Sequence, residues 1–305
     1  MENLPTDYFT TIAAYTPNVH RDQYPAIDPT SPSLSLTGKT VIITGASAGI
    51  GAQGLAPAFA KAGAKVIVLI ARNQAKLDAV TNGLRAQYPK VEFLALSAAV
   101  DSESAVKGVF DTISSKYGHA DVLINNAGVW VSGGAPIATA DPSDWWKDFE
   151  VNTKGLFLMS QGFLKLLGSK KHGTIVNMSS GVAALVGPGM SSYSVSKNAT
   201  LRLMEYVAVE HPNVTAVSMQ PGIVMTDMIT PTFKRFAHDT PEVVGGCAVW
   251  LCSEKARFLS GRFVSANWDV EELVGREEEI TAGNDLKVVY QGRFGLDQFE
   301  DGSGK

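Results

Sequence analysis

The chain is poor in charge and in cysteine, and each shortage argues against a class of protein. Only 18% of its 305 residues are charged, and 26 basic side chains stand against 30 acidic ones, a formal net charge of -4. Nucleic-acid binding needs concentrated positive charge that releases counterions from phosphates, so a nucleic-acid partner is not expected. The two cysteines, Cys247 and Cys252, lie five residues apart in an apolar stretch. They are expected to fill core volume rather than form a disulfide or bind a metal.

Long hydrophobic runs and a basic N-terminal region are also missing. The first ten residues, MENLPTDYFT, lack the basic start and the apolar run of a signal peptide. No segment reads as a membrane span. Together with the low cysteine content, this predicts a soluble protein of a reducing compartment, the cytoplasm. What the sequence does contain is 45% hydrophobic residues and 29 glycines, enough to bury a large core.

The character of the sequence changes twice along the chain. Residues 1–36 hold five of the 14 prolines and no periodic pattern, which predicts an extended arm; a disordered tag is the alternative. Residues 37–268 alternate short β-branched runs with helical stretches, which predicts an α/β fold with a single doubly wound, Rossmann-type parallel sheet and helices on both faces. Residues 269–305 form an acidic helical extension with a mobile tail. About seven strands are expected, at residues 40–44, 65–70, 91–96, 122–125, 174–178, 214–219 and 262–266.

A glycine-rich turn follows the first expected strand. Glycines permit positive φ angles and close backbone approach, and the start of the next helix offers unpaired N–H groups to a pyrophosphate. The turn therefore predicts a dinucleotide site, although its spacing is GxxxGxG rather than GxGxxG, and a merely structural turn is the alternative. The turn residues expected to bind the cofactor are Gly45, Ser47, Gly49, Ile50 and Gly51.

The end of the second strand bears on cofactor choice. It reads LIARN and carries no carboxylate. A carboxylate there accepts hydrogen bonds from the adenosine ribose and repels a 2′-phosphate, whereas Arg72 can pair with that phosphate. The sequence therefore predicts NADP(H) rather than NAD(H). A solvated surface arginine is the alternative interpretation.

Three side chains can transfer a proton at the carboxyl end of the sheet. Tyr193 and Lys197 lie four residues apart, on one face of a helix, and Ser180 follows the buried strand 174–178. An ammonium and a cofactor cation stabilise a phenolate, which lowers the phenol pKa from about 10. We expect Tyr193 to exchange a proton with a substrate oxygen held by Ser180 while hydride moves to or from carbon. Two exposed side chains are the alternative for the Tyr–Lys pair.

These motifs occur in the order and spacing of a known family. Over roughly residues 37–268 the chain resembles the classical short-chain dehydrogenases/reductases. Its local sequence is similar to that of fungal members. The motifs that carry the resemblance are Thr44-Gly45-x-x-x-Gly49-Ile50-Gly51, Asn125-Asn126-Ala127-Gly128, Asn152 in VNTKG, Ser180, Tyr193 with Lys197, and Pro221-Gly222 followed by Thr226.

The resemblance implies further roles. Asn152 joins Ser180, Tyr193 and Lys197 in a catalytic tetrad and holds a water on the proton path from Lys197, which also binds the nicotinamide ribose. Relatives commonly associate through the helices at 145–167 and 192–210, so a homodimer or homotetramer is implied. No metal is expected. The further cofactor contacts that the resemblance implies are Asn125, Ala127 and Gly128 on the adenosine side, and Gly222, Ile223 and Thr226 at the nicotinamide end.

The chain departs from the family pattern in two places. After the third strand, where the family has an Asp that touches adenine, the run is SAAVD, so either Asp101 is shifted into that place or the contact is missing. The helix after the glycine turn is one residue longer than usual and contains Gly54 and Pro57. An interior proline costs about 3 kcal/mol, so a kink or a late helix start is expected.

The expected substrate pocket is formed by the segments after Gly128, Ser180 and Gly222. The sequence predicts an NADP(H)-dependent oxidoreductase that interconverts a ketone or aldehyde and an alcohol on a lipophilic small molecule. The alternatives are a non-redox cyclisation, dehydration or epimerisation on the same fold, or a cofactor-sensing binding protein. The mostly apolar pocket residues, several of which can instead be ordinary core, are Val129, Trp130, Val131, residues 182–190, Met225, Met228, Ile229, Phe233 and Phe236.

Overall fold

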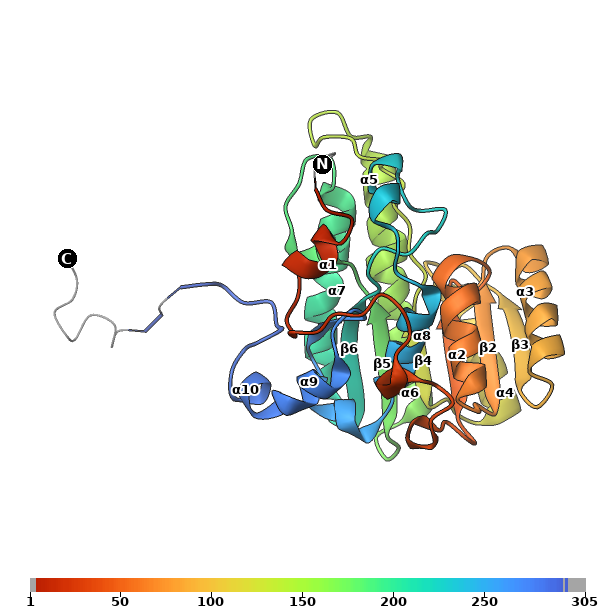
Figure 1. Cartoon of the computed structure of the whole chain (residues 1–305). Coiled ribbons are helices and arrows are strands. Elements are labelled where there is room, and N and C mark those ends of the chain that lie inside the picture. Colours follow the sequence, from red (N-terminus) through yellow and green to blue (C-terminus); the bar gives the residue numbers. More distant parts are fainter. Residues whose placement is uncertain (1–3, 293, 296–305) are drawn as a thin grey trace, which may run out of the picture.

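The computed structural model of the chain describes residues 4–292 and 294–295, so the mobile tail expected at the C-terminus lies outside the described residues. A single seven-stranded parallel sheet, in the order β3-β2-β1-β4-β5-β6-β7, forms its centre (Figure 1). The order reverses between β1 and β4, as in Rossmann-type folds, so the predicted fold is confirmed. The strands are β1 (Thr40–Thr44), β2 (Val66–Ala71), β3 (Glu92–Ser97), β4 (Val122–Asn125), β5 (Gly173–Met178), β6 (Val214–Gln220) and β7 (Phe263–Ser265).

Helices cover both faces of the sheet. In β1, Val41 and Ile43 enter the core on one face, whereas Ile42 enters the core on the other. Strands buried on both faces read as continuous apolar runs, which explains the sequence TVIIT. The first face is covered by α2 (Ala56–Lys61), α3 (Gln74–Gln87) and α8 (Pro241–Trp250), and the second by α4 (Glu103–Tyr117), α6 (Leu156–Leu167) and α7 (Ser191–Glu210), with α5 (Pro142–Phe149) packed on α7.

The helix after the glycine turn starts irregularly. Its first part, η3 (Gly51–Leu55), is a π-helical turn, and the regular helix α2 begins only at Ala56. Pro57 lies directly after the π-helical turn, where its missing N–H interrupts the regular ladder of helical hydrogen bonds. A π turn takes one more residue than an α turn, which accommodates the extra residue of this helix. The chain is already helical at Gly49 and Ile50, so the helix does not start late, and the irregularity lies in this π-helical turn.

The N-terminal arm is laid along the molecule as an extended segment, red in Figure 1. It contains α1 (Tyr8–Ile12) and two short 3-10 helices, η1 (Pro25–Ile27) and η2 (Pro32–Leu34). The side chain of Ile27 is fully buried in the core, and Val19 forms an antiparallel bridge with Trp268 at the end of β7. The arm thus packs against the same sheet that its own chain goes on to build.

The segments that follow β6 and β7 complete the fold. The β6–α8 loop, residues 221–240, contains the 3-10 helix η6 (Pro231–Phe236), and η7 (Glu254–Leu259) precedes β7. The chain continues with α9 (Val270–Gly275) and α10 (Glu277–Ala282). It then returns to the edge of the sheet, where Phe263 N–H donates to the Leu286 carbonyl (2.8 Å). The extension after β7 therefore occupies a donor on the free edge of this strand.

Both cysteines of the chain are free thiols, Cys247 buried and Cys252 part-buried. Within the described residues, no group of His, Cys, Asp and Glu side chains is placed to hold a metal ion. In the same part of the chain, no helix has the length and apolar character needed to cross a membrane.

Candidate active site

The glycine turn leaves no room for side chains. Gly45 and Gly49 have φ angles of 65° and 51°, in the left-handed region that favours glycine. A Cβ on Gly45 would lie 2.9 Å from the Ala127 Cα atom, and one on Gly51 would lie 2.3 Å from the Gly45 carbonyl oxygen. The three glycines therefore bring the backbone close to the cavity, as the approach of a phosphate requires, and Ser47 of the same turn lines it.

The turn after β4 is tied to the end of β1. Thr44 Oγ1 accepts hydrogen bonds from the N–H groups of Asn126 (2.9 Å) and Ala127 (3.0 Å). Asn125 differs, because its buried Nδ2 donates to Ser160 Oγ (3.0 Å) on α6. Of the three residues expected on the adenosine side, Ala127 and Gly128 line the cavity described next, whereas the Asn125 side chain bonds to α6 behind it.

A cavity of about 350 Å³ lies at the carboxyl ends of β1, β2 and β4. Arg72 and Lys76 both line it. Asn73 places Lys76 there, because its side chain accepts the Lys76 N–H (2.9 Å) and so begins α3. Sequence reasoning missed Lys76, although its position one helical turn after Arg72 is a usable signal. The residues present, a glycine-rich turn with Ser47 and two cations, fit the phosphates and ribose of a nucleotide.

Asp101 occupies the wall of the same cavity. Its Oδ2 accepts a hydrogen bond from Lys147 Nζ at 2.8 Å, and this bond holds the pKa of Asp101 below its usual range. Of the two readings left open by the sequence, the one that shifts Asp101 into the nucleotide cavity agrees with this position. Its carboxylate is nevertheless already paired with a cation.

Tyr193 and Lys197 meet the turn after β4. Lys197 is buried, and its Nζ donates to the Met178 carbonyl (2.8 Å) and lies 5.8 Å from the centroid of the Tyr193 ring. A Cβ on Gly128 would lie 3.2 Å from Lys197 Nζ and 3.3 Å from Asn152 Oδ1. Glycine at position 128 therefore lets the ammonium and the amide approach the nucleotide side of the site.

Burial sets the protonation of the phenol and the ammonium. It raises the pKa of Tyr193 to about 12, a shift opposed by a hydrogen bond with the Ser180 side chain and increased by the charge of Asp148. Burial also lowers the pKa of Lys197 to about 8. In the chain without cofactor, desolvation of the phenolate therefore favours the neutral phenol, and the lowered pKa expected beside Lys197 and a cofactor cation stays a prediction. Tyr193 is a neutral phenol at neutral pH.

Asn152 links the turn after β4 to α7. It lies in the π-helical segment η4 (Glu150–Gly155) and is buried. Its Oδ1 accepts from the Val129 N–H (2.8 Å), and its Nδ2 donates to the Val129 carbonyl (2.9 Å) and to Ser196 Oγ (3.1 Å). These bonds fix the backbone next to Lys197.

A buried carboxylate that sequence reasoning missed supports the same region. Asp148 is 0% exposed; its Oδ1 accepts from the Val131 N–H (2.7 Å), and its Oδ2 accepts from Ser192 Oγ (2.5 Å). It thereby joins the loop after β4 to the start of α7. The available signal was its spacing, since Asp148 lies four residues before Asn152 and shares its helical face.

The loops around Tyr193 present apolar side chains. The ring of Trp130 lies 5.9 Å from the Tyr193 ring. Phe236 differs from the expectation: it is fully buried and packs edge-on against Phe9 of the arm, so it belongs to the core. Five large apolar side chains of the expected pocket segments are exposed, namely Val131, Leu185, Val186, Met225 and Met228.

The β6–α8 loop closes on the glycine turn. A Cβ on Gly49 would lie 3.3 Å from Thr226 Cγ2, so the two segments are in contact distance. Gly222 has a φ angle of 75°, which allows the loop to turn immediately after β6. Ser180, at the end of β5, and Ile223, which follows Gly222, complete the set of site residues at this edge of the sheet.

Comparison with known proteins agrees with this geometry. The profile of the short chain dehydrogenase family matches residues 39–236. The short chain dehydrogenase mpl6 of Monascus purpureus is 40% identical over 298 residues, covering 93% of this chain and 97% of the relative. The chain belongs to the short-chain dehydrogenase/reductase family. It is therefore an oxidoreductase of a family that uses NAD(P) and acts on CH–OH and C=O groups of small molecules, as the sequence predicted.

Two further short-chain dehydrogenases are instructive. The short chain dehydrogenase pigC of Monascus ruber is 34% identical, covering 90% of this chain and 93% of the relative. The structure of a gluconate 5-dehydrogenase from Burkholderia cenocepacia, in complex with NADP and tartrate, is 25% identical with a TM-score of 0.70 and covers 79% of this chain and 96% of that one. The similarity to fungal members suggested by the sequence is thus confirmed.

Proposed function

We propose that the protein is an NADP(H)-dependent oxidoreductase that interconverts a ketone or aldehyde and an alcohol on a lipophilic small molecule. The observation that carries the proposal is the neutral, part-buried phenol of Tyr193, with Ser180 in hydrogen-bonding contact and Lys197 close by. A phenol that keeps its proton at neutral pH can serve as the general acid of carbonyl reduction.

The proton step uses residues of this chain alone. Bound nicotinamide would supply or accept the hydride. Ser180 holds the substrate oxygen by a hydrogen bond, and Tyr193 gives that oxygen its proton in reduction and takes it back in oxidation. Lys197, whose Nζ is fixed by the Met178 carbonyl, stabilises the phenolate that is left behind. Asn152 keeps the backbone beside Lys197 in place through its bonds to Val129.

Two cations support NADP(H) over NAD(H). Arg72 and Lys76 line the nucleotide cavity, and a 2′-phosphate would bring two negative charges to them. The solved structure of a short chain dehydrogenase from Shigella flexneri 2a is complexed with NADP; it is 25% identical with a TM-score of 0.68 and covers 76% of this chain and 98% of that one. We also propose that the pyrophosphate lies on the glycine turn, and the nicotinamide near Ile223 and Thr226.

Exposed apolar side chains support a lipophilic substrate. Val131, Leu185 and Met225 come from three different loops at the carboxyl end of the sheet, and each is at least 42% exposed. Water contact of such side chains is unfavourable, so a bound apolar molecule would gain free energy by covering them. Trp130 adds an indole N–H that is buried without an acceptor in the described residues, a donor available to a substrate oxygen.

A homodimer is proposed through α5, α6 and α7. These helices form an apolar groove of about 590 Å³ that includes exposed Trp146, Phe157 and Tyr206. A second copy of the chain is the expected occupant, as the resemblance implies. Sedimentation of the wild type and of Phe157→Glu tests this: a monomeric wild type would contradict it. The free thiols of both cysteines support the proposed reducing compartment, the cytoplasm.

The decisive experiment compares the wild type with Tyr193→Phe. We expect the wild type to consume NADPH, followed at 340 nm, with at least one of a panel of lipophilic ketones and aldehydes. Tyr193→Phe keeps the ring but lacks the proton, so turnover should fall by roughly 10²–10⁴-fold while NADPH binding is kept. A variant with wild-type turnover would refute the acid/base role. A wild type that binds NADPH and never oxidises it would indicate a non-redox reaction instead.

A further inference from the structure

The N-terminal arm holds the β6–α8 loop at separate points. The Leu4 carbonyl accepts a hydrogen bond from Arg235 Nη2 (2.9 Å). The ring of Phe9 packs against Phe233 and Phe236, with centroid distances of 5.5 and 4.9 Å. These contacts join the first residues of the chain to a loop more than 200 positions away, next to the glycine turn.

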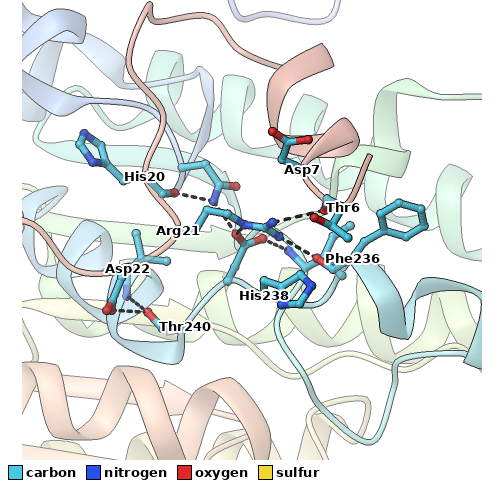
Figure 2. A network of polar contacts seen from close by, with 12 residues as sticks. Thr6, Asp7, His20, Arg21, Asp22, Phe236, His238 and Thr240 are labelled. Carbon is cyan, nitrogen blue, oxygen red and sulfur yellow. Dashed lines mark hydrogen bonds and ion pairs between the residues drawn. The ribbon is translucent and has the colours of Figure 1, made fainter. Parts of the chain in front are cut away.

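Arg21 makes the strongest link between the two segments. Its Nε donates to Asp239 Oδ1 (2.8 Å) and its Nη2 to the Phe236 carbonyl (2.7 Å). Its Nη1 donates to the Thr6 carbonyl (3.3 Å), so one guanidinium connects residues 6 and 21 of the arm to the loop. Figure 2 shows the dashed bonds that run from the Arg21 guanidinium to Thr6 and to Phe236. Such a fork of charge-assisted hydrogen bonds fixes both the distance and the relative orientation of the arm and the loop.

Asp239 carries this link to the turn that follows β6. Its side chain is fully buried, and its Oδ2 accepts a hydrogen bond from the Ile223 N–H (2.5 Å). Asn267 Nδ2 donates to Oδ1 (3.1 Å). A Cβ on Gly222 would lie 2.4 Å from Asp239 Oδ2, so the backbone of residues 222–223 packs directly against the carboxylate.

A buried carboxylate keeps such a place only when its charge is balanced. The ion-pair partner of Asp239 is Arg21, and removing one member of a buried pair leaves an uncompensated charge that draws in water or moves away. Either change would displace the Ile223 N–H. The arm also pairs with the start of α8, since Thr240 N–H donates to the Arg21 carbonyl (2.8 Å), so the loop is held at its far end as well.

We propose that Arg21 and Asp239 are positioning residues for the nicotinamide end of the cofactor, and that the arm is part of the construction of the active site although it lies outside the sheet. This rests on the proposed function, which places the nicotinamide beside Ile223. The adenosine side is built from β1, β2 and β4 without the arm. Loss of Arg21 therefore affects recognition of the nicotinamide end and spares recognition of the adenosine end.

Calorimetric titration of two ligands tests this in the full chain. NADPH reports on the whole cofactor site, and adenosine 2′,5′-bisphosphate reports on its adenosine half. For Arg21→Met we expect NADPH to bind about tenfold more weakly and kcat/KM to fall about 10²-fold, because a displacement near 1 Å at the reacting end is costly. The bisphosphate should bind as it does to the wild type.

Two variants separate positioning from general support of the arm. Arg276→Met is the matched control, because Arg276 also holds the arm, through the Tyr15 carbonyl and a cation–π contact of 3.7 Å, but from the end of α9. It should lower thermal stability without changing the ratio of the two affinities. Arg21→Lys keeps a cation beside Asp239 but loses the fork of N–H groups, so it should weaken NADPH binding less than Arg21→Met does and leave bisphosphate binding unchanged; this variant also serves if Arg21→Met does not fold.

The outcomes are distinct. An Arg21→Met protein that binds NADPH and turns it over like the wild type overturns the proposal, and so does equal weakening of both ligands, which would indicate a merely structural role. If Arg21→Met does not fold, an Arg21→Lys protein that binds both ligands like the wild type, or that weakens both equally, overturns it. A wild type that binds neither ligand refutes the proposed function itself, before any variant is compared.

Discussion

The two sides of the site are built in different ways. On the adenosine side, strand ends of one sheet bond directly to one another, as when Asn126 and Ala127 donate to Thr44. On the nicotinamide side, the turn after β6 rests on Asp239, which the arm balances through Arg21, 218 positions earlier. The bonds that shape the adenosine side therefore come from the sheet itself, although Thr226 of the β6–α8 loop reaches the glycine turn. The part that meets nicotinamide and substrate depends on a segment added in front of the fold.

Lys197 stands where the two sides meet, and its replacement should have the largest effect. Lys197→Met removes the ammonium beside Tyr193, so turnover should fall by at least about 10²-fold, the usual contribution of a proton-transfer group. The free energy of unfolding of Lys197→Met should rise, although its turnover falls. Burial lowers the pKa of Lys197 to about 8, so the charged form destabilises the fold below that pH, and an apolar isostere often gains roughly 1–4 kcal/mol.

Urea denaturation at pH 7 and at pH 9.5 measures this stability. The unfolded lysine binds its proton up to its ordinary pKa of about 10.4, whereas the folded one releases it near 8, so the cost of burial shrinks as the pH rises through this interval. The gain of Lys197→Met over the wild type should therefore be larger at pH 7. An equal gain at both values would show that folding does not lower the pKa of Lys197.

Substitution of Asp148 tests whether the loop after β4, near Tyr193, can be changed without changing the adenosine side. Asp148→Ala leaves the Val131 N–H without its acceptor in a buried place and leaves the Ser192 hydroxyl with Ser132 Oγ alone as partner, which should cost roughly 1–3 kcal/mol of unfolding free energy. Asp148→Asn keeps an oxygen for the Val131 N–H, removes the charge, and replaces the oxygen that accepts from Ser192 by an NH2 donor. Since that charge raises the pKa of Tyr193, the asparagine variant should lose its proton donor at a lower pH.

The measurements are a denaturation curve for each variant and the pH dependence of NADPH turnover for Asp148→Asn. Adenosine 2′,5′-bisphosphate affinity should be unchanged in the asparagine variant, since Asp148 contacts the loop after β4 beyond the nucleotide cavity. If this affinity fell along with turnover, the separation of the two sides would be refuted.

The same contrast explains what the sequence could predict. The seven strands and the glycine turn follow from local patterns, because parallel strands buried on both faces must be apolar and a backbone-only turn must be glycine. The partner of Asp239 does not follow from any pattern. Arg21 lies in an aperiodic, proline-rich stretch, and its contact with Asp239 exists only once the whole sheet has brought both ends of the chain together.

The protonation of Tyr193 was beyond the sequence for a related reason. Spacing alone places the ammonium of Lys197 one helical turn from the phenol, which favours ionisation. The opposing effect, desolvation, depends on how many segments close over the ring, among them Trp130 from the loop after β4. A pKa is the balance of both effects, and only the second needs the folded chain.

The variants that change cofactor preference are expected to have the smallest effect, and they test the adenosine side directly. Arg72 and Lys76 are exposed, so each should contribute only about tenfold to the preference for NADPH over NADH, roughly 1.4 kcal/mol. Arg72→Ala and Lys76→Ala should each lower the ratio of the two affinities, and the double variant should lower it further. Because the nicotinamide end is held separately, kcat at saturating cofactor should stay at the wild-type value. A ratio that Arg72→Ala leaves unchanged would remove this residue as the selector, and a fall in kcat would show that the two sides are coupled after all.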